Sequence, residues 1–267
     1  GRVPTMASAL APDGLKRNQL SWLHNGTCRG GGISQRTCWF NGNISFTNGP
    51  KWSGLYQGGW MYRPDNAFPY LMLDIGGRTY QVRVDTDFSV VDVTIPGDAN
   101  PANEPQHWHT QAEQFMVIQD GNSEPLVWDG NVLQRANTMP GAQPTVPVGQ
   151  AMDYVFGRLW VTLASNLRQY VGSDIVLGPD GTAGYGFRDS VLKFIENTYL
   201  AGGGAFTVPT LAGNIRAMSH TVNLDTALGE SDLYVFTRNS IYATSVPFTR
   251  AEWITVREPL QRLVQAD

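Results

Sequence analysis

The sequence predicts an all-β protein built from propeller-like repeats of short antiparallel strands, and three observations support this class. Residues 113–136 contain short apolar runs separated by Gln-Asp-Gly and by Asp129-Gly130, and Asp-Gly between apolar runs favours a type I′ hairpin turn. Residues 79–84 alternate branched or aromatic side chains with polar ones, as in a half-buried strand. Strand-turn-strand centres fall near residues 76, 121, 157 and 239, and the first three are about 40 residues apart, the period of a propeller blade.

The composition favours a protein that buries large surfaces. The 267 residues are 42% hydrophobic and only 16% charged, with 29 Gly, 16 Pro, 8 Trp and 10 Tyr, which indicates many turns and much aromatic packing. The net charge of −4 argues against tight nucleic-acid binding, which requires a basic surface. Because no run approaches the roughly 18 apolar residues of a membrane span, we expect no stable membrane insertion.

The first 54 residues are expected to differ from the rest. They lack sustained periodicity and are interpreted as an irregular N-terminal arm or a first blade, with short strands near 37–40 and 44–46. Cys28 and Cys38 leave two alternatives open, a disulfide or two reduced thiols. Because the chain begins with Gly1, we expect residues to precede it. The predicted domains are therefore 1–54 and a β-repeat domain at 55–267.

From residue 55 the chain is predicted to form short strands separated by turns. The first is expected at 55–62, broken by Gly58-Gly59. The others are expected at 70–75, 78–84 and 90–95, at three places within 113–136, and at 152–156, 159–163, 169–171, 215–222, 233–236 and 241–246.

One short helical insertion and an unpaired end complete the predicted elements. Residues 190–196 place Val191, Leu192 and Ile195 on one helix face, and Asp189 is a candidate N-cap. Residues 202–204 are expected to form a loop. Residues 260–267 resemble a strand without a visible partner, so the propeller is expected to be either incomplete or closed by another segment or subunit.

One motif suggests metal chemistry. His107 and His109 followed by Glu113 form HxHxxxE, which resembles the first metal-binding motif of the cupins. Alternate strand residues share a face, so both histidines are placed to reach one ion. The glycine expected before the first histidine is absent, and the second cupin motif is missing, with His220 standing alone. The alternative is a surface or interface histidine pair, and we therefore predict no metal, no cofactor and no catalytic residue.

Other candidate motifs are explained by local structure without a functional site. Trp128-Asp129 resembles the WD dipeptide of WD40 blades, but a tryptophan entering a hairpin accounts for it. Turn carboxylates can pair across a cleft as in a glycosidase, although most such residues bond to local backbone; they are Asp65, Asp74, Asp85, Asp87, Asp92 and Asp98. Arg78, Arg158 and Arg238 lie at or beside turns, where they either contact another subunit or are solvated.

Several segments, taken in chain order, carry a resemblance to a known family. They include YQGGWMYRP, PYLMLDIGGRTYQVRVDTD, QAEQFMVIQDGNSEPLVWDG, YVFGRLWVTLA and LDTALGESDLYVFTRNSIYA. Across residues 55–265 they resemble tail proteins of short-tailed bacteriophages, of the tubular or nozzle type. The resemblance implies a β-propeller-containing subunit, several copies of which ring the tail channel below the portal and adaptor.

The resemblance also implies a function and a location. It implies a non-enzymatic structural protein of the virion, which contacts copies of itself and other tail proteins such as the adaptor and fibres. DNA is expected to pass through the ring without specific binding. Two alternatives come from other classes: a β-rich enzyme, either cupin-like or glycan-cleaving, and a module that binds host glycans.

Overall fold

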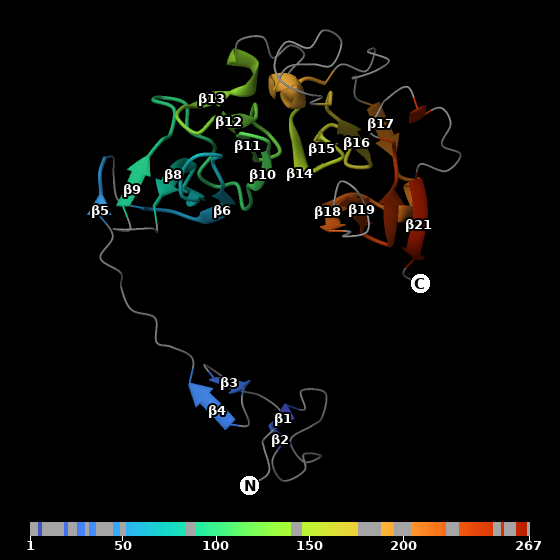
Figure 1. The fold of residues 1–267 in the computed structure, drawn as a ribbon, viewed down its shortest axis with the longest axis horizontal. Helices are drawn as coiled ribbons and strands as arrows, with labels where there is room; N and C mark the ends of the chain where they lie inside the picture. Colours follow the sequence, from blue (N-terminus) through green and yellow to red (C-terminus); the bar gives the residue numbers. More distant parts are fainter. Residues whose placement is uncertain are drawn as a thin grey trace. The chain divides into compact units, whose positions relative to one another are not determined.

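The computed structural model contains two compact units, Gly1–Asn43 and Ile44–Asp267 (Figure 1). Within them the structure describes residues 5–6, 19–20, 26–29, 32–35, 45–48, 52–83, 89–139, 146–175, 188–194, 204–222, 230–247, 252–253 and 260–265. The first unit has a parallel pair, β1 (Thr5–Met6) and β2 (Gln19–Leu20), and an antiparallel hairpin, β3 (Gly26–Arg29) and β4 (Gly32–Gln35). Cys28 lies on β3, whereas Cys38 and the strand expected near 37–40 lie outside the described residues.

The second unit contains four small sheets among its described residues, which we call blades 1 to 4. Blade 1 comprises β5 (Ser45–Phe46), β6 (Tyr56–Tyr62), β7 (Tyr70–Ile75), β8 (Arg78–Val82) and β9 (Ser89–Asp92). Blade 2 comprises β10 (Trp108–Ala112), β11 (Phe115–Gln119), β12 (Leu126–Trp128) and β13 (Leu133–Arg135), followed by the 3-10 turn η2 (Ala136–Thr138).

Blades 3 and 4 follow the same plan. Blade 3 comprises β14 (Gly149–Val155), β15 (Arg158–Leu163), β16 (Gln169–Gly172) and β17 (Gly204–Thr207), with the 3-10 turn η3 (Arg188–Leu192) before its last strand. The 3-10 turn η4 (Thr210–Ala212) leads to blade 4, which comprises β18 (Ile215–Val222), β19 (Glu230–Thr237), β20 (Ser240–Thr244) and β21 (Leu260–Gln265).

Each blade is an antiparallel meander in which four consecutive strands are neighbours, and β5 adds to blade 1 in parallel with β9. The first strands, β6, β10, β14 and β18, contact one another in succession. In Figure 1 they lie on the inner side of the series, with the last strand of each blade outermost. The all-β class is therefore confirmed, and the arrangement fits the geometry of propeller blades around an axis.

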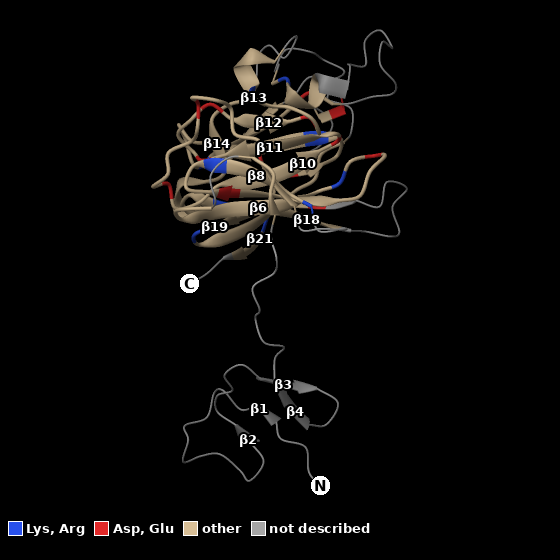
Figure 2. Ribbon diagram, turned by 90° about the vertical axis from the view of Figure 1, so that its left-hand side faces the viewer, with Lys and Arg blue, Asp and Glu red and all other residues tan. Residues whose placement is uncertain are grey.

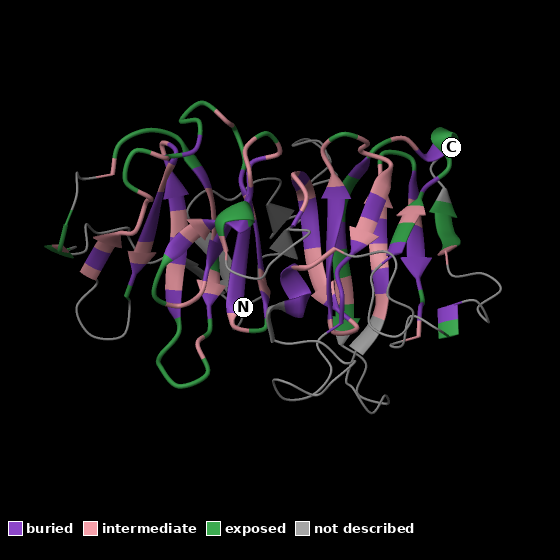
Figure 3. Cartoon of the chain, turned by 90° about the horizontal axis from the view of Figure 1, so that it is seen from above, coloured by how far each residue is buried: buried purple, intermediate pink, exposed green. Residues whose placement is uncertain are grey.

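Apolar side chains alternate between the two faces of each blade, so a core forms between each pair of neighbours. On β11, Met116 and Ile118 pack toward blade 1, whereas Phe115 and Val117 pack toward blade 3. Between blades 3 and 4, Trp160 is fully buried and stacks on Trp253 with ring centroids 6.1 Å apart. Figure 3 shows buried positions running along the strands and exposed positions gathering in the loops. Burial of these faces holds the blades together.

Several predicted details are corrected by the pairing. The terminal segment was expected to lack a partner, but β21 pairs antiparallel with β20. The three strands of 113–136 are present, but the turn at Asp129-Gly130 is not type I′. Trp128 pairs with Leu133, so residues 129–132 form the loop, and only Gly130 has a positive φ, of 98°. Asp129 Oδ1 instead accepts hydrogen bonds from the backbone N–H groups of residues 131 and 132, as in an Asx turn.

Other corrections concern element boundaries. β6 runs without a break through Gly58 and Gly59, with an irregular register between Tyr56 and Gly58. The described helical insertion is the 3-10 turn η3, which contains Asp189 instead of being capped by it. β17 begins at Gly204, within the expected loop.

The division expected after residue 54 falls at Asn43/Ile44, because β5 pairs with β9. Among the described residues, no helix is long and apolar enough to span a membrane.

Candidate functional site

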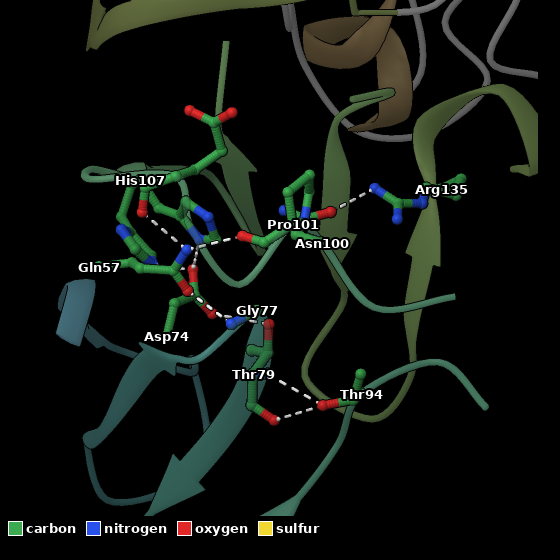
Figure 4. Close-up of polar contacts among 11 residues, drawn as sticks. Gln57, Asp74, Gly77, Thr79, Thr94, Asn100, Pro101, His107 and Arg135 are labelled. Carbon is green, nitrogen blue, oxygen red and sulfur yellow. Dashed lines mark hydrogen bonds and ion pairs between the residues drawn. The ribbon is translucent and has the colours of Figure 1, made fainter. Parts of the chain in front are cut away.

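The histidine pair lies between blade 1 and blade 2. His107 precedes β10, and His109 is on it. Their side chains are 1% and 2% exposed, and both face Asp74, which projects from β7 of blade 1 (Figure 4). The sequence reveals the two histidines but not their partner, which is 33 positions from His107.

One carboxylate oxygen contacts both rings. Asp74 Oδ2 accepts a hydrogen bond from His107 Nδ1 at 2.8 Å, and His109 Nε2 lies 2.9 Å away without hydrogen-bond alignment. Asp74 Oδ1 accepts a hydrogen bond of 2.7 Å from Thr79 Oγ1 on β8. The carboxylate therefore links two strands of blade 1 to the first strand of blade 2.

The environment favours the ionised form of Asp74. Burial by itself raises the pKa of the carboxyl group. The electrostatic interaction with His109 and the hydrogen bond from His107 act in the opposite direction and together lower the pKa of Asp74 below its ordinary value. A buried carboxylate held by such partners is costly to leave without them.

This geometry differs from a cupin metal centre. The two rings converge on a carboxylate oxygen, and the third residue of the motif, Glu113, is exposed at the β10–β11 turn, where it accepts a hydrogen bond from Tyr154. No group of three His, Cys, Asp or Glu side chains in the described part of the chain is placed to hold a metal ion. Both rings are also buried, so the histidine pair does not lie on the surface. It lies at the contact between blade 1 and blade 2.

Gln57 on β6 strengthens the same boundary. Its Oε1 accepts a hydrogen bond of 2.6 Å from the backbone N–H of Gly77, and its Nε2 donates to the carbonyls of Pro101 and Glu104, both at 2.9 Å (Figure 4). A Cβ at Gly77, where φ is 80°, would lie 2.0 Å from the carbonyl oxygen of Asn100. Glycine is therefore required for this close approach.

A buried polar side chain recurs on the second strand of the first three blades, facing the next blade. In blade 2, Gln119 accepts a hydrogen bond from the backbone N–H of Gly149 and donates to Met152 Sδ at 3.2 Å. In blade 3, Thr162 Oγ1 donates to Met218 Sδ at 3.8 Å. Asp74 occupies the matching place in blade 1. Its contacts with the two histidines therefore correspond to the contacts that Gln119 and Thr162 make with blades 3 and 4.

The turn arginines differ in their surroundings. Arg158 is fully buried, and its guanidinium lies 5.2 Å from the ring centroid of Trp253. Arg78 pairs with Asp92 on β9, and Arg238 is exposed. Arg158 is therefore neither solvated nor exposed for contact with another subunit, and both predicted alternatives are wrong for it.

The turn carboxylates are equally varied. Asp98 pairs with Arg135, whose hydrogen bonds lower the pKa of Asp98. Asp65 is exposed, and Asp85 and Asp87 lie outside the described residues.

An open groove of about 860 Å³ lies beside β6. Aromatic, charged and amide side chains line it, including Tyr56, Trp60, Arg63, Asp65, Glu113 and Tyr154. A hollow of about 380 Å³ shares Trp60 and Tyr154 with it and is lined by the first strands of all four blades. In this hollow the His220 and Asp153 side chains pair, with Nδ1 and Oδ2 2.9 Å apart.

A scan against protein-family models finds no match to this chain, and a search of curated proteins also finds none.

Proposed function

We propose that this chain is a structural subunit of a bacteriophage tail, which assembles into a ring or tube around the DNA channel and aids genome ejection. The resemblance of residues 55–265 to nozzle-type tail proteins supports this proposal. The resemblance implies a propeller-containing subunit, and the four propeller-like blades span nearly the same residues. The role is architectural, not enzymatic, and its place is the virion.

The observation that carries the proposal is the character of β21, the outermost strand of blade 4. Leu263 and Val264 on this strand are 51% and 54% exposed. The register is irregular here, because Val264 pairs with Ile241 and Arg262 pairs with Tyr242, so that the ladder skips Leu263. β21 therefore presents two adjacent exposed apolar side chains at the edge of blade 4. An exposed apolar edge strand invites pairing or packing with another chain. A subunit of a ring needs such a surface at the end of its blade series.

The charge distribution agrees with a channel that lets DNA pass. The chain carries a net charge of −4, and Figure 2 shows charged positions sparsely distributed over the blades. Such a surface gives no counterion-release gain on contact with phosphates. The proposed partners are therefore copies of this chain and neighbouring tail proteins such as the adaptor and fibres, with DNA as a passing cargo.

Analytical ultracentrifugation of the full chain tests the proposal. The wild type should sediment as a multimer, and the double variant Leu263→Asp, Val264→Asp should shift toward monomer, because charges replace the apolar contact. Leu211→Asp is the matched control, since Leu211 is 90% exposed but lies in η4, and it should assemble like the wild type. A wild type that stays monomeric at all accessible concentrations rejects the proposal.

A further inference from the structure

We infer that the groove beside β6 binds a neutral oligosaccharide, a function that goes beyond the proposed structural role. The groove and the adjoining hollow share Trp60, Gln111 and Tyr154 as lining residues. Their volumes of about 860 and 380 Å³ fall within the roughly 300–1,000 Å³ of small-molecule sites. Two neighbouring compartments that share lining residues suit a chain of several sugar rings better than one compact ligand.

Exposed aromatic rings supply the stacking surface. Tyr56 and Trp60, both on β6, are 59% and 51% exposed and both line the groove. Among the described aromatic side chains of this unit, most are buried or partly buried, and the exposed ones are Tyr56, Trp60 and Phe68. Two of these three therefore line the groove. The C–H face of a pyranose ring is apolar and packs against an aromatic face. A tyrosine or tryptophan that presents one apolar surface and a polar edge is suited to such a half-wet contact.

Polar groups that match sugar hydroxyls line the same groove, and the structure holds them in place. Gln111 fixes the geometry: its Nε2 donates to the carbonyls of Arg63 and Glu113 at 2.8 and 2.9 Å, and its Oε1 accepts from the N–H of Arg63 at 2.8 Å. This amide therefore joins the end of β6 to the β10–β11 turn. Preorganised polar groups bind a ligand at a lower entropic cost.

Glu113 supplies a carboxylate to the groove from a tight turn. Its φ is 53°, a left-handed conformation that is uncommon for a residue other than glycine. Its carboxylate accepts a hydrogen bond from Tyr154 OH of blade 3. The left-handed conformation belongs to the two-residue turn between β10 and β11, since Ala112 pairs with Phe115, and Phe156 has a φ of 58° in the matching turn of blade 3. At Glu113 this turn places a carboxylate at the edge of the groove.

The charge of the lining selects the class of sugar. Asp65 and Glu113 outnumber Arg63 among the charged lining residues, so the groove is acidic overall. An acidic glycan would be repelled, whereas hydroxyls of a neutral hexose chain donate to carboxylates and accept from a guanidinium. The structure therefore favours a neutral oligosaccharide over a uronic or sialic acid polymer.

Isothermal titration of the full chain with maltohexaose, cellohexaose and chitohexaose tests the inference, with glucose as the single-ring control. At least one hexamer should bind at millimolar concentration or below, and more tightly than glucose. Trp60→Ala should weaken that binding at least about tenfold, as expected for loss of an aromatic anchor. Trp60→Phe should retain most of it, and Glu113→Gln, which keeps an oxygen for Tyr154, should weaken it less than Trp60→Ala.

Leu211→Ala is the control for removal of an exposed apolar side chain elsewhere, and it should bind like the wild type. Circular dichroism of each variant checks that it is folded. Binding of none of the three hexamers overturns the inference, as does equal binding by the wild type and a folded Trp60→Ala. If Trp60→Ala instead dissociates the assembly while no hexamer binds the wild type, the groove is a protein interface and the inference is wrong. Assembly of the wild type is measured separately by sedimentation, so failure here leaves the proposed structural role intact.

Discussion

Asp74→Asn is the perturbation that best tests how the blades are joined. The Asp74 side chain is 1% exposed and links Thr79 to both buried histidines. Leaving a buried donor without its acceptor costs about 1–3 kcal/mol, and more where the acceptor is charged. Asparagine keeps an oxygen for Thr79, so we expect a loss of about 2–3 kcal/mol.

Asp98→Asn is the matched control. Asp98 pairs with Arg135, and its side chain is 46% exposed whereas that of Arg135 is 10% exposed, so we expect this half-exposed pair to contribute less than the fully buried cluster. Urea unfolding followed by tryptophan fluorescence and by circular dichroism measures both variants, and coincident transitions justify a two-state treatment. If Asp74→Asn costs no more than Asp98→Asn, the buried cluster does not stabilise the contact between blades 1 and 2.

The pH dependence provides a second readout of the same cluster. Because the folded-state pKa of Asp74 lies below its ordinary value, folding favours the ionised carboxylate. Its contribution is complete above the unfolded pKa of about 3.9 and is lost as the pH falls below that value. The difference in unfolding free energy between the wild type and Asp74→Asn should therefore shrink below about pH 4. A difference that grows on acidification would contradict this assignment.

Three further substitutions test the packing, all by urea unfolding. Gly58→Ala should destabilise the protein by about 1–3 kcal/mol, because its Cβ would lie 2.5 Å from the carbonyl oxygen of His107; an unchanged midpoint would show that the blades can separate at no cost. Trp160→Ala should lower the free energy of unfolding by about 3–5 kcal/mol, because the Trp160 side chain is fully buried. The Trp60 side chain is half-exposed, so Trp60→Ala should lower it by about 0.5 kcal/mol. Equal losses would contradict the difference in burial.

The strands with clear alternation could be predicted from the sequence. Tyr70–Ile75 and Ile215–Val222 have the predicted bounds, because apolar and β-branched residues mark them. The sequence does not predict β10 as a blade strand, because its residues WHTQA are mostly polar. Its polar residues are nevertheless buried, since His109 contacts Asp74 and Thr110 Oγ1 donates to the carbonyl of Met152. Only tertiary contacts make this strand suitable for the interior.

The four predicted strand-turn-strand centres do not occupy equivalent places in their blades. The centre near residue 157 joins the first and second strands of blade 3, whereas those near 76, 121 and 239 join second and third strands. The sequence does not predict β17, because Gly204 is typical of a loop. In the structure Gly204 is a strand residue, and a Cβ there would lie 2.3 Å from the Trp253 ring. Glycine is present because a distant tryptophan occupies that space, and local sequence does not reveal this.

The sequence predicts only part of the candidate sites. The histidine pair could be identified as unusual, but its partner Asp74 lies on another blade. The groove could not be predicted, because Trp60, Glu113 and Tyr154 come from three blades. The positive φ of Glu113 also has no sequence signal, since that conformation usually indicates glycine.

Electron microscopy of the purified full chain tests the proposed assembly. We expect rings of subunits around an open channel, with the outer edge of blade 4, including Leu263 and Val264, at the contact between neighbouring subunits. Isolated compact monomers, or rings in which that edge faces solvent, would contradict it.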